Sequence, residues 1–220
     1  MKKFLQSYTI LVKNTRIVQE SPISKKIFDV AKLQSGYFTS KQAQKAGFDY
    51  YLQSYHVKTG NWERVVRGIY RLVDFSILEN DQYVLWYLWS RDRNDQPQGV
   101  YSHETALSIY ELSDVSPSKL HMTVPLSFRR NSKIPDILIL HYDTVDEKDI
   151  EFMQGFAVTK PMRTILDLAK AEFVSRDILA QAITEGCQKG LLLRSKIQEI
   201  KELDFIKPWI RHLFKTNNNE

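Results

Sequence analysis

The arrangement of apolar and polar residues changes character within the first third of the chain. Residues 22–34, 39–46 and 49–59 carry apolar residues at helical spacing, and a glycine follows each segment, as at many helix ends. Residues 61–72, NWERVVRGIYRL, then alternate between apolar and polar positions on both sides of Gly68. This alternation is typical of a two-stranded hairpin, so the pattern predicts three helices and then a hairpin.

Residues that favour helix starts stand at the beginning of each predicted helix. Pro22 suits the first turn of the first helix, and Thr39 with Gln42 three residues later fits a capping box. Asp49 suits the N-cap of the third helix. This order of helices and hairpin is that of a winged helix-turn-helix. We therefore predict such a DNA-binding domain, with an N-terminal extension, over residues 1–75.

The third helix of such a domain enters the major groove of DNA, where its outward side chains meet base edges. We expect Leu52, Tyr55 and His56 to face inward, and Tyr70 of the hairpin to pack on the core. Gln53 suits an adenine edge, and the hairpin arginines suit phosphates or a narrow minor groove. The expected DNA contacts are Lys41, Gln44, Lys45, Tyr50, Gln53, Ser54, Lys58, Arg64, Arg67 and Arg71.

The rest of the chain mixes helical and strand-like patterns. Helical spacing recurs over residues 76–93, 101–112, 161–172, 175–190 and 193–205. Runs typical of strands cover residues 119–126, 134–142 and 156–159. We therefore predict an α+β protein whose second domain, residues 76–220, is a mixed α/β domain ending in a polar tail.

Charge is distributed unevenly between the two predicted domains. Residues 1–73 hold 13 Lys and Arg against 4 Asp and Glu, a net charge of +9, whereas residues 74–220 hold 18 against 22, a net charge of −4. A basic segment joined to an acidic remainder indicates that the basic segment meets a polyanion. Together with the helix order, this distribution favours double-stranded DNA as the partner.

Composition argues against several classes of protein, among them disulfide-rich and membrane-spanning proteins. The single cysteine, Cys187, excludes a disulfide framework and a cysteine-rich zinc site, and it suits a reducing compartment. Polar residues interrupt the N-terminal segment MKKFLQSYTILV, so we expect no signal peptide. No apolar run reaches the ~18 residues of a membrane helix. We expect a cytoplasmic protein with no cofactor, no bound metal, no membrane contact and no small-molecule substrate.

A metal-dependent nuclease is the alternative function that the second domain leaves open. Asp136 follows Pro135, and Asp146 and Lys148 lie further along the chain. These residues fit a loose nuclease pattern, in which the two carboxylates hold a magnesium ion that activates water. The pattern is short, and Asp146 lies in a charged run that is typical of a loop. A non-catalytic protein-interaction module is a further alternative.

Other polar residues of the second domain favour structural roles. His103, His121 and His141 lack the close spacing of a zinc site, so we expect hydrogen-bonded structural histidines at the strand positions. Arg163 and Asp167 stand four residues apart on a predicted helix and can pair. The candidates for a functional role in this domain are Arg163, Arg129 and Arg130.

The chain resembles the AbiEi family of antitoxins and transcriptional regulators, which belong to bacterial type IV toxin–antitoxin and abortive-infection systems. The segments that carry the resemblance, in the order seen in the family, are FTSKQAQKAGF, ERVVRGIYRL, YSHETALSIYELSD, HMTVP and VTKPMRTILDLAK. The resemblance runs from about residue 24 to residue 190.

The resemblance implies an N-terminal winged helix-turn-helix that binds repeats in its own promoter, and a C-terminal antitoxin domain without catalytic activity. It implies a partner, a nucleotidyltransferase-like toxin whose effect the antitoxin opposes. It carries over all the expected DNA contacts except Lys45, and it makes Gly68 and Tyr70 structural residues of the wing. The third helix departs from the common family pattern because it is rich in aromatic residues and poor in arginine.

Overall fold

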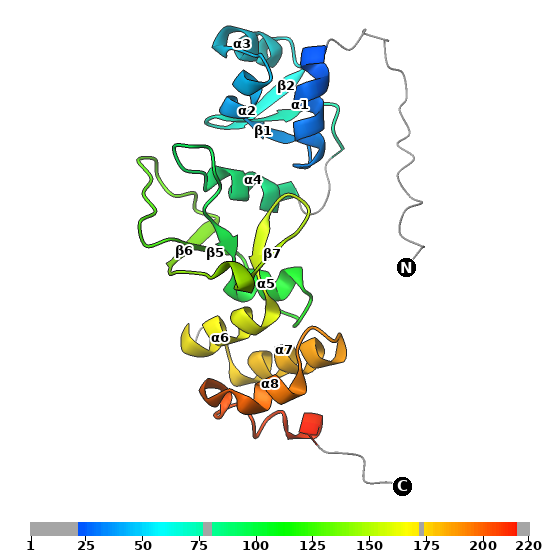
Figure 1. Cartoon of the computed structure of the whole chain (residues 1–220), viewed down its shortest axis with the longest axis vertical. Helices are drawn as coiled ribbons and strands as arrows, with labels where there is room; N and C mark the ends of the chain where they lie inside the picture. Colours follow the sequence, from blue (N-terminus) through cyan, green and yellow to red (C-terminus); the bar gives the residue numbers. More distant parts are fainter. Residues whose placement is uncertain (1–21, 77–80, 172–173, 215–220) are drawn as a thin grey trace. The chain divides into compact units, whose positions relative to one another are not determined.

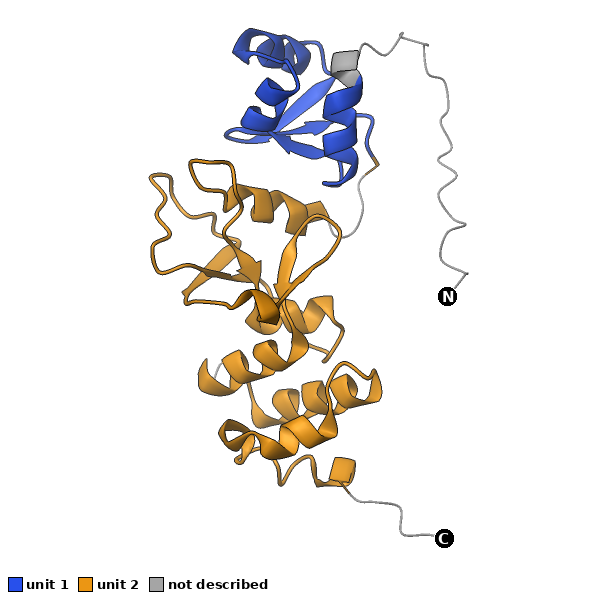
Figure 2. Ribbon diagram, in the orientation of Figure 1, with its two compact units in different colours: residues 1–75 blue, residues 76–220 orange. Residues whose placement is uncertain are grey.

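The computed structural model describes residues 22–76, 81–171 and 174–214, and the side chains from residue 25 onward (Figure 1). The expectations for residues 1–20, for the start of the helix at residues 77–80 and for the tail after residue 214 lie outside the described residues. The chain divides into two compact units, Met1–Phe75 and Ser76–Glu220, shown in different colours in Figure 2. We call them unit 1 and unit 2.

Unit 1 is built from three helices and a three-stranded antiparallel sheet within its described residues. Its elements, in chain order, are α1 (Pro22–Lys32), β1 (Tyr37–Thr39), α2 (Ser40–Lys45), α3 (Tyr50–Lys58), β2 (Trp62–Val66) and β3 (Ile69–Leu72). The strands lie in the order β1-β3-β2, so the β2–β3 hairpin is joined to the helices through β1. The predicted helices and hairpin are confirmed, and β1 is an addition that the pattern did not predict.

The core of unit 1 is gathered around Trp62 of β2. Its indole lies 4.7 Å from the ring of Phe38 and 4.9 Å from that of Phe48, both edge to face, and it stacks on His56 at 4.8 Å. Edge-to-face and stacked aromatic pairs add to the stabilisation that buried area provides. Tyr70 stacks on Phe38 at 5.9 Å, so its expected packing on the core is confirmed.

A tight turn and an irregularity shape the β2–β3 hairpin. Gly68 has a φ of +75°, a conformation that glycine adopts without steric cost, and it lets the chain reverse between the strands. The register shifts between Arg64 and Val66, so strict alternation ends before the turn. As a result the side chain of Arg67 lies at the exposed tip of the hairpin.

Unit 2 contains a five-stranded mixed sheet with helices before, between and after its strands. Its strands are β4 (Val100–Tyr101), β5 (Leu120–Val124), β6 (Leu138–Tyr142), β7 (Ile150–Phe152) and β8 (Ala157–Thr159), in the sheet order β6-β5-β4-β8-β7. The pairs β5–β6 and β4–β8 are parallel, and β4–β5 and β7–β8 are antiparallel.

The helices of unit 2 follow the predicted pattern closely. Within the described residues they are α4 (Asp81–Trp89), α5 (His103–Ile109), α6 (Pro161–Ala171), α7 (Arg176–Gln188) and α8 (Arg194–Glu199), with 3-10 turns at Glu147–Asp149, Lys201–Leu203 and Arg211–Phe214. Helix α5 contacts β5 and α6, and α6 contacts α7. No helix in the described part of the chain is long and apolar enough to cross a membrane.

Candidate nucleic-acid interface

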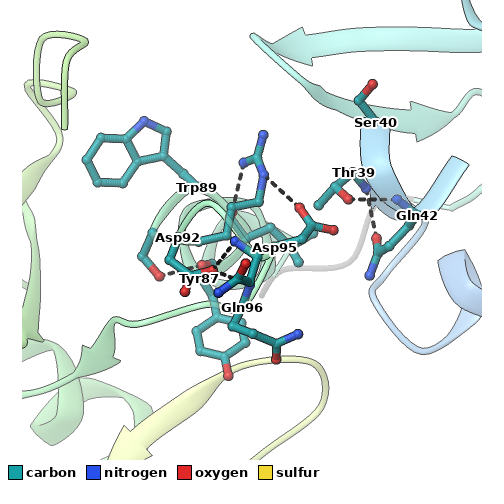
Figure 3. Close-up of polar contacts among 12 residues, drawn as sticks. Thr39, Ser40, Gln42, Tyr87, Trp89, Asp92, Asp95 and Gln96 are labelled. Atoms are coloured by element: carbon teal, nitrogen blue, oxygen red, sulfur yellow. Dashed lines mark hydrogen bonds and ion pairs between the residues drawn. The ribbon is translucent and has the colours of Figure 1, made fainter. Parts of the chain in front are cut away.

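The junction between β1 and α2 is fixed by a capping box (Figure 3). The backbone N–H of Gln42 donates to Thr39 Oγ1 at 3.1 Å, and the backbone N–H of Thr39 donates to Gln42 Oε1 at 2.8 Å. The two side chains thereby satisfy N–H groups that a helix start otherwise leaves without partners. The Asp49 carboxylate caps α3 with a single hydrogen bond, accepting from the N–H of Leu52 at 2.8 Å. Both predicted caps are confirmed, and they set the directions of α2 and α3.

Gln53 points into unit 1 and not toward solvent. It is 1% exposed, its Nε2 donates to the carbonyl oxygen of Phe48 at 2.8 Å, and its Oε1 accepts from Ser40 Oγ at 2.7 Å. The amide therefore ties α3 to the start of α2 and to the turn between them. In this structure Gln53 cannot reach a base edge, so its expected contact with adenine is corrected to a role inside the turn.

The outward face of α3 is largely aromatic. The exposed fractions are 70% for Tyr50, 78% for Tyr51 and 52% for Tyr55. Tyr55 and Leu52 were expected to face inward, and both lie at the surface because Gln53, with its backbone partners, occupies the inward position instead. Tyr51 was missed as a surface residue, although its spacing from Tyr55 is that of a helical stripe.

We call this face the tyrosine stripe. Its members follow one another at helical spacing on the outward side of α3 and are Tyr50, Tyr51, Ser54, Tyr55 and Lys58. Ser54 donates its hydroxyl hydrogen to the carbonyl oxygen of Tyr50 at 2.9 Å. The expected surface positions of Tyr50, Ser54 and Lys58 therefore agree with the helix. The three tyrosine side chains are exposed, and the ring of Tyr55 also lies edge to face with His56 at 5.5 Å.

Cations lie on the elements that neighbour α3 in the chain. Lys41, Gln44 and Lys45 are exposed on α2, as a contact with a nucleic-acid backbone requires. Arg64 and Arg67 are exposed on the hairpin, and no acidic side chain of the described residues forms an ion pair with either. Four of these five exposed side chains are cations, and the exposed stripe of α3 adds one more, Lys58.

Arg71 has a different environment from the other hairpin arginines. Its side chain is mostly buried, and its guanidinium donates to the Glu63 carboxylate on the neighbouring strand at 2.8 Å. The pair spans β2 and β3 at directly opposed positions. Arg71 is therefore held by the hairpin itself, and its expected contact with DNA would require this ion pair to open.

His56 adds no charge to this surface near neutral pH. Burial lowers the pKa of its imidazole from 6.5, and the ring stacks on Trp62. Its Nδ1 lies 3.2 Å from the amide nitrogen of Asn61, which follows α3. The positive charge of the surface therefore comes from its lysines and arginines.

In unit 2, Arg163 is an internal ion-pair residue. Its Nε donates to Asp167 Oδ1 and its Nη2 to Asp143 Oδ2, both at 2.7 Å. The predicted pair between Arg163 and Asp167 is confirmed. Burial raises the pKa of the Asp167 carboxyl, so the nearby guanidinium matters for keeping it ionised.

Arg129 and Arg130, the other two candidates of unit 2, are also engaged by their own chain. Arg129 donates to the carbonyl oxygens of Leu126 and Phe128 at 2.9 Å and 2.8 Å. Arg130 donates to the carbonyl oxygens of Trp89 and Arg91, and its guanidinium lies 4.7 Å above the Trp89 ring. These contacts give both arginines a structural explanation.

The structure does not bring the residues of the nuclease pattern together. Asp136 precedes β6 and Asp146 follows it, so a five-residue strand, roughly 16 Å long, lies between them in the chain. Each is exposed and paired with its own neighbour, Asp136 with Lys133 at 2.9 Å and Asp146 with Lys148 at 3.2 Å. In the described part of the chain, no three His, Cys, Asp or Glu side chains are arranged to hold a metal ion.

Three histidines of unit 2, distant in the sequence, meet on one side of its sheet. The ring of His103 stacks on that of His141 with centroids 3.7 Å apart, and His121 Nδ1 lies 3.1 Å from His141 Nε2. Glu104 lies 3.6 Å from the remaining nitrogen of His121, and Ser102 bonds His103 Nδ1 at 2.9 Å. We call these three imidazoles the histidine cluster.

The histidine cluster is neutral near pH 7. Burial lowers the pKa of His103 to about 3, helped by His141, by His121 and by the positive charge of Arg163. Burial, with His121, lowers the pKa of His141 to about 4, and burial lowers that of His121. The expected structural histidines are present at the strand positions, but their stacking was not predicted because it depends on the register of β5 and β6.

The chain is similar to one protein-family model and to a solved structure. Residues 25–73 match a family model described as "Transcriptional regulator, AbiEi antitoxin", which confirms the resemblance over that segment. The fold resembles that of the RV2827C protein from Mycobacterium tuberculosis, with a TM-score of 0.51, 11% sequence identity, and coverage of 89% of this chain and 73% of that chain. At this identity the likeness concerns fold alone, and it agrees with the mixed α+β class. A comparison with curated proteins found no match.

Proposed function

We propose that unit 1, whose residues 25–73 match the model of the AbiEi antitoxin family of transcriptional regulators, binds double-stranded DNA as a winged helix-turn-helix. Helices α2 and α3 correspond to the helix-turn-helix, with α3 as the helix that enters the major groove. The hairpin β2–β3 is the wing. The DNA is the promoter of the chain's own gene, where binding represses transcription.

The observation that supports this function most is the exposure of cations on α2, α3 and the hairpin. Lys41, Lys45, Lys58, Arg64 and Arg67 are all exposed and come from the three elements that a winged helix-turn-helix presents to DNA. Residues 1–73 carry a net charge of +9, and the remaining residues carry −4. Phosphate contacts by such side chains release counterions and supply most of the non-specific affinity.

Unit 2 is proposed to be the antitoxin domain of a type IV toxin–antitoxin pair. Its partner is a nucleotidyltransferase-like toxin, whose effect it counters without a catalytic step of its own. Arg163, Arg129 and Arg130 are engaged by groups of unit 2 itself, so we assign them to its stability and not to a reaction. The family match ends at residue 73, so this assignment rests on the resemblance of segments such as SHETAL and RTILDL.

A promoter-binding experiment tests the DNA function. The full chain is titrated into a labelled duplex that covers the region upstream of its gene, with a shuffled duplex of the same composition as the control. We expect a salt-sensitive shift that is stronger on the promoter. The Arg64→Ala/Arg67→Ala variant is expected to lose most of it, while Arg129→Ala, a matched arginine of unit 2, keeps it. A promoter shift absent at low salt would refute the DNA function.

Co-expression tests the antitoxin function separately. The product of the neighbouring gene is induced in cells with and without this chain, and growth is recorded. We expect growth arrest that the full chain relieves, and relief that persists in the Arg64→Ala/Arg67→Ala variant when both proteins are expressed from unrelated promoters. Arrest that this chain does not relieve would contradict the antitoxin assignment and leave the DNA result standing.

A further inference from the structure

The tyrosine stripe presents an unusual set of groups for a helix that reads DNA. The side chains of Tyr50, Tyr51 and Tyr55 are exposed, Ser54 has its hydroxyl hydrogen bonded to the backbone, and Lys58 lies in the last turn. No arginine, asparagine or glutamine lies on the stripe, because the one carboxamide of α3, Gln53, is buried and bonded inside the turn. The stripe therefore offers large apolar surfaces and few directed donors.

Each base presents different hydrogen-bonding groups or a methyl group in the major groove, and the side chains of the stripe suit some of them better than others. Guanine is read best by the paired donors of arginine or lysine, and adenine by the carboxamide of asparagine or glutamine. Thymine alone among the four bases carries a methyl group in the groove, and apolar side chains contact it. Three exposed rings on a stripe that itself carries no guanidinium and no carboxamide favour thymine.

We propose that the tyrosine stripe of α3 recognises thymine methyl groups, so that the DNA elements bound by this chain are duplexes rich in A·T pairs. The proposal rests on the proposed function of unit 1, and it names the sequence class that this surface selects. The rings of Tyr51 and Tyr55 pack on the methyl groups and remove them from water. Lys58 and the exposed cations of α2 and the hairpin hold the phosphates on either side.

Charge argues that the occupant of this apolar stripe is DNA and not a protein or a membrane. Lys58 on the stripe is exposed, as are Lys41, Lys45, Arg64 and Arg67 on the elements next to α3 in the chain, whereas Asp49 uses its carboxylate to cap the helix. Unit 1 therefore combines an exposed apolar stripe with exposed cations. That combination matches the groove of a duplex, where methyl groups lie between two rows of phosphates.

Synthetic alternating duplexes test the proposal without knowledge of the operator. The full chain is titrated into poly(dA-dT), poly(dA-dU), poly(dG-dC), poly(dG-5-methyl-dC) and poly(dI-dC) of equal length at one salt concentration. Uracil differs from thymine only by the missing methyl group. We expect poly(dA-dT) to bind about tenfold more tightly than poly(dA-dU), since each buried methyl group contributes roughly fourfold. Poly(dG-5-methyl-dC) is expected to bind more tightly than poly(dG-dC).

Binding to poly(dI-dC) shows whether the protein reads the major or the minor groove. Its minor groove resembles that of A·T pairs because inosine lacks the guanine amino group, but its major groove has no methyl. We expect it to bind as weakly as poly(dG-dC). If it binds as tightly as poly(dA-dT), and uracil makes no difference, the hairpin reads the minor groove and the proposal is overturned.

Variants assign the methyl preference to the stripe. Tyr51→Ala/Tyr55→Ala is expected to bind poly(dA-dT) and poly(dA-dU) equally while keeping salt-sensitive binding, because the cations remain. Phe152→Ala, an aromatic of unit 2 with similar exposure, is expected to keep the tenfold preference. Circular dichroism checks that each variant is folded. A preference that survives the loss of both tyrosines overturns the proposal.

Failure of the proposal and failure of the proposed function give different results. Equal, salt-sensitive binding to all five duplexes overturns thymine recognition and leaves the DNA function intact. Binding to none of them at low salt overturns the DNA function, and the inference with it.

Discussion

Arg64 on the hairpin of unit 1 and Arg163 near the start of α6 in unit 2 are the same residue type in opposite environments. Arg64 is exposed, and within the described residues no carboxylate pairs with it. Arg163 is mostly buried, and its guanidinium bonds two carboxylates and the carbonyl oxygen of Thr144. Arg64 is therefore accessible to a partner, whereas Arg163 holds segments of unit 2 together.

Aromatic side chains also lie in contrasting environments, some exposed and others buried. In unit 1 the tyrosines of α3 face solvent, while Trp62, Phe38 and Phe48 fill the core. In unit 2, Tyr101 is fully buried, packs against Phe156, and donates its hydroxyl to the carbonyl oxygen of Tyr83 at 2.8 Å. The contrast teaches that residue type alone does not identify a binding surface.

The largest effect is expected from removing the buried arginine. Arg163→Ala leaves Asp167 buried without its partner, so we expect the free energy of unfolding of unit 2 to fall by about 3 kcal/mol. Arg64→Ala is expected to change stability by less than about 0.5 kcal/mol. Urea denaturation followed by tryptophan fluorescence measures the first, since three of the four tryptophans lie in unit 2. Equal effects of the two substitutions on stability would remove the contrast between the units.

A pH change is expected to destabilise unit 2. The imidazole of His103 takes up a proton near pH 6.5 when unfolded, but its pKa in the folded protein is about 3. The unfolded chain therefore binds more protons between these values, and the free energy of unfolding falls as the pH falls. We expect a loss of about 2 kcal/mol between pH 7.5 and pH 5 from this group.

The His103→Asn variant is the control for this pH effect. His103 has a φ of +51°, a conformation that asparagine tolerates, so the variant can keep the local backbone. We expect its stability to change less than that of the wild type over the same pH range. A variant whose stability falls just as steeply would show that other groups cause the effect.

A smaller effect is expected at two neighbouring positions of α3. Gln53→Ala removes the hydrogen bonds to Ser40 and Phe48, so unit 1 is expected to lose about 1–2 kcal/mol of stability. Ser54→Ala, at an exposed position, is expected to lose less than about 0.5 kcal/mol. Thermal unfolding of both variants tests the inward placement of Gln53. A Gln53→Ala variant of unchanged stability that bound promoter DNA more weakly would restore the expected base contact.

The features that could be predicted from the sequence are those set by close neighbours in the chain. The capping box of Thr39 and Gln42 depends on a spacing of three residues, and the pair of Arg163 and Asp167 on a spacing of four. The long helices of unit 2 follow from apolar periodicity over three turns or more. Each of these features carries its partner within the same short segment, so the pattern is sufficient.

The features that the sequence did not predict depend on distant partners. Gln53 turns inward because Ser40 and the carbonyl of Phe48 lie where its amide can bond them. The histidine cluster forms because β5 and β6 pair with Thr123 opposite His141. Strands β4 and β7 have two and three residues, too few to show a periodicity. Register and packing decide these cases, and neither is visible in one sequence.

The measurement that tests the account most directly is the salt dependence of promoter binding by the wild type and by Arg64→Ala/Arg67→Ala. Each phosphate contact contributes about 0.9 to the slope of log affinity against log salt concentration. If both hairpin arginines contact phosphates, we expect the variant's slope to be smaller by about 2, with unchanged stability. A variant with the wild-type slope and affinity would contradict the claim that unit 1 binds DNA through this exposed surface.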